Sequence, residues 1–310
     1  MREIIFKRYG MLKRIVFIWK KSEIMNDMKT LLRELEEKRI QVSVESADSE
    51  ARSVIFRAGM PYEDANAEDA PEMTEEISER ETLYVTDCAF WQRHFREKGL
   101  PVIIYLHEDN RKENFMLAEY AIEQIGEIEF ESLELAYLRL TGQPWTILRT
   151  DRCMIRETTT DDVDSFYEIY REPSITEYME GLYDDRDEET AYVQDYIRNV
   201  YRFYGYGMWT VLEKKEGKVI GRAGLSWREG FALPELGFVI GVPWQKQGYA
   251  YEVCRAILEY GRRELGFTSF QALVMKGNEK SCRLCEKLGF VCEEDVELEG
   301  VEYRKMVLKI

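Results

Sequence analysis

The chain has 310 residues and a formal charge of −16 at pH 7, with 33% charged and 45% hydrophobic residues. This length allows two hydrophobic cores, and both halves of the chain have an excess of acids, which excludes the basic footprint of a nucleic-acid-binding domain. We find no apolar run that could span a membrane and no signal-peptide pattern at the N-terminus. We therefore expect a two-domain cytoplasmic protein with reduced cysteines and with neither nucleic acid nor a membrane as a partner.

The first half alternates between strand and helix patterns. Strands are expected at 14–19, 40–44, 83–87 and 102–106, and helices at 24–35, after Asp87, at 112–124 and at 132–140. Alternating strands and helices favour a small parallel sheet with helices wound on both faces. The acidic stretch from Glu63 to Glu81 is expected to form a solvated loop and helix face. Residues 1–145 are thus predicted to form a Rossmann-like accessory domain.

Part of this half resembles a haloacid-dehalogenase-type phosphatase, through Val85-Thr86-Asp87 and Gly99-Leu100-Pro101-Val102-Ile103. That family needs a nucleophilic aspartate and a second acid at the end of its first strand. Here the first strand runs into Trp19-Lys20-Lys21-Ser22, so the resemblance implies a degenerate domain without phosphatase activity. An aspartate directly after a strand is also typical of a helix cap, and we favour this interpretation for Asp87.

The second half has a different order of elements. A boundary is expected at Gly142–Trp145, with the second domain at 151–310. Strands are predicted at 152–157, 208–212, 219–225, 235–240, 270–275, 291–298 and 303–309, and helices from 161 to 170, from 188 to 203, after Ala250 and from 278 to 288. This order is typical of an α+β domain with a mixed central sheet flanked by helices.

One loop in this domain has a sequence pattern that is typical of an anion-binding site. Gln245, Gly248 and Ala250 stand between a strand and a long amphipathic helix, and Gly248 and Ala250 are small. Small residues let the backbone approach an anion, and the free N–H groups of a first helical turn point at it. A tight turn without a ligand explains such a hexapeptide equally well when it stands by itself.

The whole arrangement resembles the GNAT superfamily of acetyl-CoA-dependent N-acetyltransferases. Gln245, Gly248 and Ala250 match its pyrophosphate loop, while Asn278-x-x-Ser281, the segment 286–290 and Glu235-x-Gly237-Phe238 are similar to the branch of ribosomal-protein N-terminal acetyltransferases. The resemblance implies a GNAT fold and transfer of an acetyl group from acetyl-CoA to a primary amine by direct attack on the thioester. The acceptor is then a small amine or a protein N-terminal amine. The cofactor-binding residues implied are Phe238, Val239, Ile240, Gln245, Lys246, Gln247, Gly248, Tyr249, Ala250, Asn278, Ser281 and Cys285.

Two residues are candidates for proton transfer. Glu235, early in its strand, would deprotonate the ammonium group directly or through water, although it could instead face solvent or pair with a neighbouring strand. Many GNAT enzymes place a proton-donating tyrosine where this chain has Cys285, so Ser281 is the better candidate for protonating the leaving thiolate. Ser281 and Asn278 also fit a plain helix cap. The family's geometry places a strand amide near Val239 or Ile240 at the thioester carbonyl.

Several alternatives stay open at this point. The aromatic residues between Tyr178 and Trp227 either line the acceptor site or pack on the sheet. Cys282, Cys285 and Cys292 lack a fourth ligand nearby, so we expect no metal site. The alternative function is a non-catalytic acyl-CoA-binding sensor or interaction protein. The acceptor and the oligomeric state are not determined by the sequence.

Overall fold

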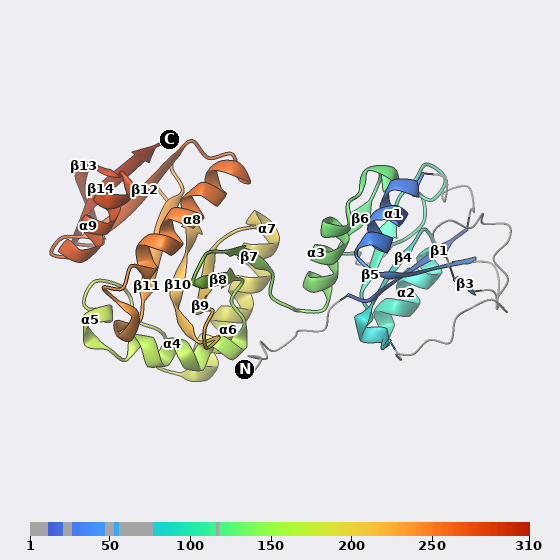
Figure 1. The fold of residues 1–310 in the computed structure, drawn as a ribbon, viewed down its shortest axis with the longest axis horizontal. Helices are drawn as coiled ribbons and strands as arrows, with labels where there is room; N and C mark the ends of the chain where they lie inside the picture. The colour runs from blue at the N-terminus through green and yellow to red at the C-terminus, as the bar shows by residue number, and fades with distance from the viewer. Residues whose placement is uncertain (1–11, 21–26, 47–52, 56–76, 116–117) are drawn as a thin grey trace. The chain divides into compact units, whose positions relative to one another are not determined.

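The computed structural model describes residues 12–20, 27–46, 53–55, 77–115 and 118–310. The chain divides into two compact units between Gln143 and Pro144, and Figure 1 shows one sheet in each. Within the described residues, no helix has both the length and the apolar character needed to cross a membrane.

The N-terminal unit is built on a sheet with the strand order β3-β2-β1-β4-β5-β6. Five of its strands run parallel, whereas β3 pairs antiparallel with β2 at one edge. The strands are β1 (Arg14–Trp19), β2 (Gln41–Ser46), β3 (Ser53–Ile55), β4 (Thr82–Thr86), β5 (Val102–Tyr105) and β6 (Ala121–Ile122). The helices are α1 (Lys29–Glu37), α2 (Ala89–Glu97) and α3 (Phe130–Leu140).

Helices cover both faces of this sheet, as the alternating pattern predicts. Alternate residues of β1 point to opposite faces, so Ile15 and Phe17 pack with α1 and α3 while Val16 and Ile18 pack with α2. The predicted Rossmann-like parallel sheet is therefore confirmed. The helix predicted at 112–124 is wrong, because this segment contains no described helix and ends in β6, which pairs with β5. Most of the acidic stretch, including 63–76, lies outside the described residues.

The C-terminal unit is built on a mixed sheet with the order β13-β14-β12-β11-β10-β9-β8-β7. All neighbours are antiparallel except β11 and β12. The strands are β7 (Thr146–Arg149), β8 (Cys153–Arg156), β9 (Met208–Glu213), β10 (Val219–Ser226), β11 (Glu235–Ile240), β12 (Ser269–Met275), β13 (Val291–Leu298) and β14 (Val301–Lys309). The predicted mixed sheet is confirmed, and residues 146–149, which the sequence pattern left between the domains, add the edge strand β7.

Helices divide this sheet into two faces. They are α4 (Val163–Tyr170), α5 (Pro173–Thr176), α6 (Arg186–Tyr196), a π-helical turn at Ile197–Tyr201, α7 (Arg202–Tyr204), α8 (Tyr249–Arg263) and α9 (Glu279–Leu288). On the first face, Val253 and Ile257 of α8 pack on Leu236 and Phe270 of the strands in the main core, and Figure 1 shows α8 lying along the sheet. On the second face, Val239 packs against α4 and α5. The strand β11 contributes side chains to both faces, with Leu236 on the first and Val239 on the second.

Candidate active site

The two parallel strands β11 and β12 form a fork. Their pairing contains a single register contact, Glu235 with Gln271, and the backbone N–H of Gln271 donates to the carbonyl of Pro234 at 2.9 Å. Beyond this point β11 continues to Ile240 and β12 to Met275 without pairing further. One edge of β11 is therefore left without a strand partner in the part of the chain that the structure describes.

The backbone groups at this open edge can be identified from the opposite edge of β11. Gly241 N–H donates to the Ile220 carbonyl at 2.8 Å, and bonded residues alternate along an antiparallel pair. Val239 therefore bonds to β10, whereas the backbone groups of Phe238 and Ile240 point toward β12. The carbonyl of Ile240 accepts a hydrogen bond from the Gln245 side chain at 2.9 Å. The N–H groups of Phe238 and Ile240 are left at the fork as donors.

The loop after β11 turns directly into α8. Lys246 and Gly248 both have left-handed backbone, with φ of 58° and 86°, and Gly248 is the residue that precedes the helix. Gln247 is exposed, and its side chain donates to the Pro243 carbonyl at 2.7 Å. Tyr249 and Ala250 begin the helix, so its first N–H groups have no intrahelical acceptor. This end of the helix is suited to an anion.

Arg152 is a functional candidate that the sequence pattern did not identify. Its guanidinium lies 4.3 Å from the centre of the Tyr249 ring and donates to the Gln247 carbonyl at 3.0 Å. Glu252 holds it in place through a contact of 2.7 Å to Nε. Arg152 and Tyr249 are distant in sequence, so only the packing of β8 beside α8 reveals this positive charge at the loop.

The start of α9 brings together two of the three residues predicted there. Asn278 is the N-cap, and its side-chain oxygen accepts the N–H of Ser281 at 3.1 Å, so the capping interpretation describes this contact. Ser281 is half-buried in the first turn of the helix. Cys285 is completely buried in the core, and burial raises the pKa of its thiol to about 12.

The carboxylate of Glu235 is engaged at the base of the fork. It is 8% exposed and forms a two-point ion pair with Arg228, at 2.7 Å to Nε and 3.1 Å to Nη2. Next to it, Gln271 is fully buried, and neither its amide nitrogen nor its amide oxygen has a hydrogen-bond partner. Most buried polar groups in proteins do have partners, so the unpaired amide of Gln271 marks this position as unusual.

The aromatic residues between Tyr178 and Trp227 divide into two groups. Trp209 is fully buried and meets Tyr260 edge to face, which is the sheet-packing alternative. Tyr183 and Tyr204 are about half exposed, at 52% and 48%. Tyr178 lies beside the turn before α9, because a Cβ atom at Gly277 would sit 3.4 Å from its ring.

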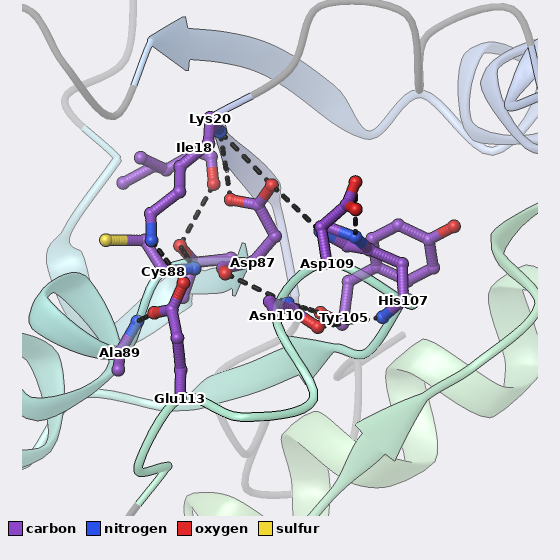
Figure 2. A network of polar contacts seen from close by, with 11 residues as sticks. Ile18, Lys20, Asp87, Cys88, Ala89, Tyr105, His107, Asp109, Asn110 and Glu113 are labelled. Carbon is purple, nitrogen blue, oxygen red and sulfur yellow. Dashed lines mark hydrogen bonds and ion pairs between the residues drawn. The ribbon is translucent and has the colours of Figure 1, made fainter.

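The N-terminal unit has its own polar cluster at the carboxyl ends of β1 and β4, which Figure 2 shows. Asp87 is fully buried, and its two oxygens accept the backbone N–H of Lys20 at 2.9 and 3.2 Å. Burial raises the pKa of Asp87, although His107 at 3.4 Å opposes this effect. The side chain of Asn110 donates to the carbonyls of Asp87 and Tyr105.

This cluster corrects the interpretation of Asp87 as a helix cap. The residue before α2 is Cys88, and no side chain caps the helix from that position. Glu113 instead accepts the first N–H, from Ala89, at 3.1 Å, and pairs with the Lys20 ammonium. Asp87 therefore links the end of β4 to the end of β1 through its hydrogen bonds with the Lys20 N–H.

Comparison with known proteins gives the family of the C-terminal unit. Residues 152–291 match the acetyltransferase (GNAT) domain model. The chain is 32% identical to the Bacillus subtilis protein YkkB over 147 residues, 46% of this chain and 84% of YkkB. It is 28% identical to the Bacillus subtilis N-acetyltransferase YnaD over 143 residues, 46% of this chain and 81% of that protein.

A structural comparison covers the same part of the chain. The crystal structure of a GNAT-family acetyltransferase from Bacillus anthracis has a TM-score of 0.45 and 21% identity, and the match covers 52% of this chain and 97% of that one. The sequence matches by themselves confirm the predicted enzyme class, whereas the N-terminal unit lies outside the matched family model. Through its C-terminal domain, the chain belongs to the GNAT family of N-acetyltransferases, which use an acyl-CoA.

Proposed function

We propose that the C-terminal domain transfers an acetyl group from acetyl-CoA to a primary amine by direct attack on the thioester. The observation that supports this most strongly is the fork. The unpaired N–H groups of Phe238 and Ile240 lie along the same strand that leads into the Gly248 loop and the start of α8. A pantetheine arm lying along β11 would meet amide donors, and its pyrophosphate would meet a helix N-terminus.

The charges around the loop support a diphosphate at this end. Arg152 is fixed over Tyr249 by Glu252, and Lys246 stands exposed in the loop. Two cations and the helix N-terminus together provide a site for two phosphate groups. In this assignment Gln245 has a structural role, because its side chain holds the loop against Ile240.

Amide donors at the fork also suit the reaction itself. Negative charge develops on the thioester oxygen when the amine attacks, and a fixed N–H group stabilises it without reorganisation. Of the two amides named in the sequence analysis, Ile240 is the better candidate, because Val239 bonds to β10. Alignment of the amine with the thioester provides most of the remaining acceleration.

We assign the proton transfers to Glu235 and Ser281. Glu235 would accept a proton from the ammonium group, and its pairing with Arg228 means that part of this ion pair must open as it does so. Ser281, half-buried at the start of α9, would protonate the thiolate. Asn278 keeps its side-chain amide nitrogen for the pantetheine arm, since the side-chain oxygen caps the helix.

The test is a calorimetric titration with acetyl-CoA of the wild type and of Gly248→Trp. The matched control is Gly300→Trp, because Gly300 has φ of 80° against 86° for Gly248 and lies in the β13–β14 turn. Both substitutions impose similar backbone strain, but only the first fills the loop. We expect micromolar binding to the wild type and the control, and none to Gly248→Trp. Equal binding to all three proteins would contradict the proposed site.

A second titration and an amine panel separate the enzyme from a sensor. Binding of acetyl-CoA without release of the CoA thiol in the presence of protein N-terminal peptides, polyamines or small amines would favour the acyl-CoA-binding sensor. Thiol release that depends on the amine would exclude it.

A further inference from the structure

The second face of the C-terminal sheet contains a buried arginine without a carboxylate partner. Arg222 of β10 is 8% exposed, and its Nε has no hydrogen-bond partner. Its guanidinium lies 4.8 Å from the centre of the Phe166 ring of α4 and donates a hydrogen bond to the Tyr170 hydroxyl. No ion pair joins Arg222 to an acid in the described part of the chain. Burying such a charge is costly unless an anion compensates it.

A buried carboxylate lies near Tyr170 and near a second tyrosine, Tyr192. Glu189 of α6 is 2% exposed; its Oε2 accepts the N–H of Tyr183 at 3.1 Å, whereas its Oε1 has no partner. Burial raises the pKa of Tyr170 and of Tyr192, the positive charge of Arg222 lowers it, and the negative charge of Glu189 raises it further. Both charges therefore act on the same two phenols without pairing with each other.

This cluster lies beside the position where the reaction is proposed to occur. Arg222 is directly opposite Val239 in the β10–β11 register, so the two side chains share one face of the sheet. Cβ atoms in such pairs are about 5 Å apart. On the solvent side, Tyr183 and Tyr192 are 52% and 43% exposed, with ring centres 5.8 Å apart.

We propose that Arg222 and Glu189 form the acceptor subsite, and that the acceptor is a free α-amino acid. This inference rests on the proposed function. The amino acid carboxylate pairs with the guanidinium of Arg222, whose planar fork matches a carboxylate. Glu189 attracts the ammonium group, and both buried charges then have partners.

The reaction in this subsite is balanced without another reactant. The ammonium group loses a proton, and the amine nitrogen attacks the thioester carbon. A C–N bond forms, the C–S bond breaks, and the nitrogen loses a second proton while the thiolate gains one. The products are the N-acetyl amino acid, CoA with a free thiol, and one proton released to solvent.

The same charges discriminate against other amines. A polyamine has no anion for Arg222 and would bring further positive charge beside it. A protein N-terminus has a neutral amide where an amino acid has its carboxylate, so the guanidinium would stay unpaired. In this proposal the subsite selects its acceptor by the acceptor's carboxylate group, because every candidate acceptor has an amine.

The test compares each of the twenty standard L-amino acids with its own C-terminal amide, measured as CoA thiol release by the full chain. A hydrogen bond to a charged group is worth about 1.5–3 kcal/mol, so we expect kcat/KM of the best amino acid to exceed that of its amide by about 10-fold to 150-fold. In Arg222→Met this ratio should fall toward one. Arg222→Lys, which keeps the charge and loses the fork, should give an intermediate ratio.

Two controls keep the outcomes distinct. Acetyl-CoA titration and thermal unfolding of each variant show whether it folds and binds the cofactor. Equal rates for acids and amides, an unchanged ratio in Arg222→Met, or thiol release only with polyamines or peptides would overturn the amino acid subsite and leave the proposed function standing. If the wild type does not bind acetyl-CoA, the proposed function fails, and the subsite fails with it.

Discussion

At the carboxyl end of β4 in the N-terminal unit, Asp87 is buried with both oxygens bonded to the Lys20 N–H and with His107 beside it. In the C-terminal unit, by contrast, Arg222 of β10, Glu189 of α6 and Gln271 of β12 are also buried, and each has a polar atom without a hydrogen-bond partner. Polar groups that satisfy each other hold strands together, whereas unpaired buried groups are costly and need a reason. A ligand that completes them in the C-terminal unit is such a reason.

The largest expected effect is a fall in kcat, and it tests whether the C-terminal unit contains the active site. Glu235→Gln and Ser281→Ala should each lower kcat by about 100-fold, the lower range for loss of a general base or acid, with no change in the Kd of acetyl-CoA. The measurement is steady-state thiol release combined with calorimetry. Glu213→Gln is the control, because its carboxylate binds backbone N–H groups of the β9–β10 turn. Wild-type kcat in both variants would remove the two assignments.

The next effect concerns stability in the N-terminal unit. Asp87→Ala removes the carboxylate that accepts the Lys20 N–H, and the loss of this hydrogen bond to a charged group should cost about 1.5–3 kcal/mol in the free energy of unfolding. Asp87→Asn keeps an acceptor and should cost less. Urea unfolding followed by circular dichroism measures both. Acetyl transfer should not change in either variant, and a loss of transfer in Asp87→Asn would show that this cluster belongs to a site.

The Asp87 cluster also predicts a pH dependence with a definite sign. Burial raises the pKa of Asp87 above its ordinary 3.8, so between that value and the raised pKa the folded state binds more protons than the unfolded state. The part of the stability that is linked to protonation of Asp87 is therefore full below pH 3.8 and is lost as the pH rises through the folded pKa. In Asp87→Asn this part of the pH profile should disappear. An unchanged profile would assign it to another group.

The smallest effect is expected at the loop that leads into α8. Burial acts to raise the pKa of Glu252, but hydrogen bonds from Thr150 and Arg152 outweigh it and lower the pKa below 4.5. Ionised Glu252 thus stabilises the fold above about pH 4.5, and this stability is lost as the pH falls.

Glu252→Gln should weaken acetyl-CoA binding about threefold to tenfold, because Arg152 is held less firmly. Calorimetry at pH 7 measures the change, and unaltered affinity would exclude Arg152 from the cofactor site.

Local patterns predicted the parts of the fold that depend on neighbours in sequence. The strand–loop–helix at Gly248 and the cap at Asn278 were found in this way. The helix predicted at 112–124 failed because the segment ends in β6, whose two residues gain their hydrogen bonds from β5, a distant partner. Asp87 was misread for the same reason, since its acceptor role depends on Lys20, which directly follows β1.

The candidate site shows the same limit. Glu235, Gly248 and Ser281 stand in motifs and could be named from the sequence, but the ion pair of Glu235 with Arg228 could not. Arg222 and Glu189 belong to no motif, and their charges fit solvated surface positions as well as buried ones. Only the packing of α4 on β10 and of α6 on α4 reveals that both side chains are buried.

The most direct test of the comparison is amide hydrogen exchange of the full chain with and without acetyl-CoA. The open edge of β11 predicts that exchange at Phe238 and Ile240 slows on binding, while Thr86 to Ala89 around the Asp87 cluster stay unchanged. Unaltered exchange at both β11 amides in a protein saturated with acetyl-CoA would contradict the assignment of the fork as the acyl-CoA site.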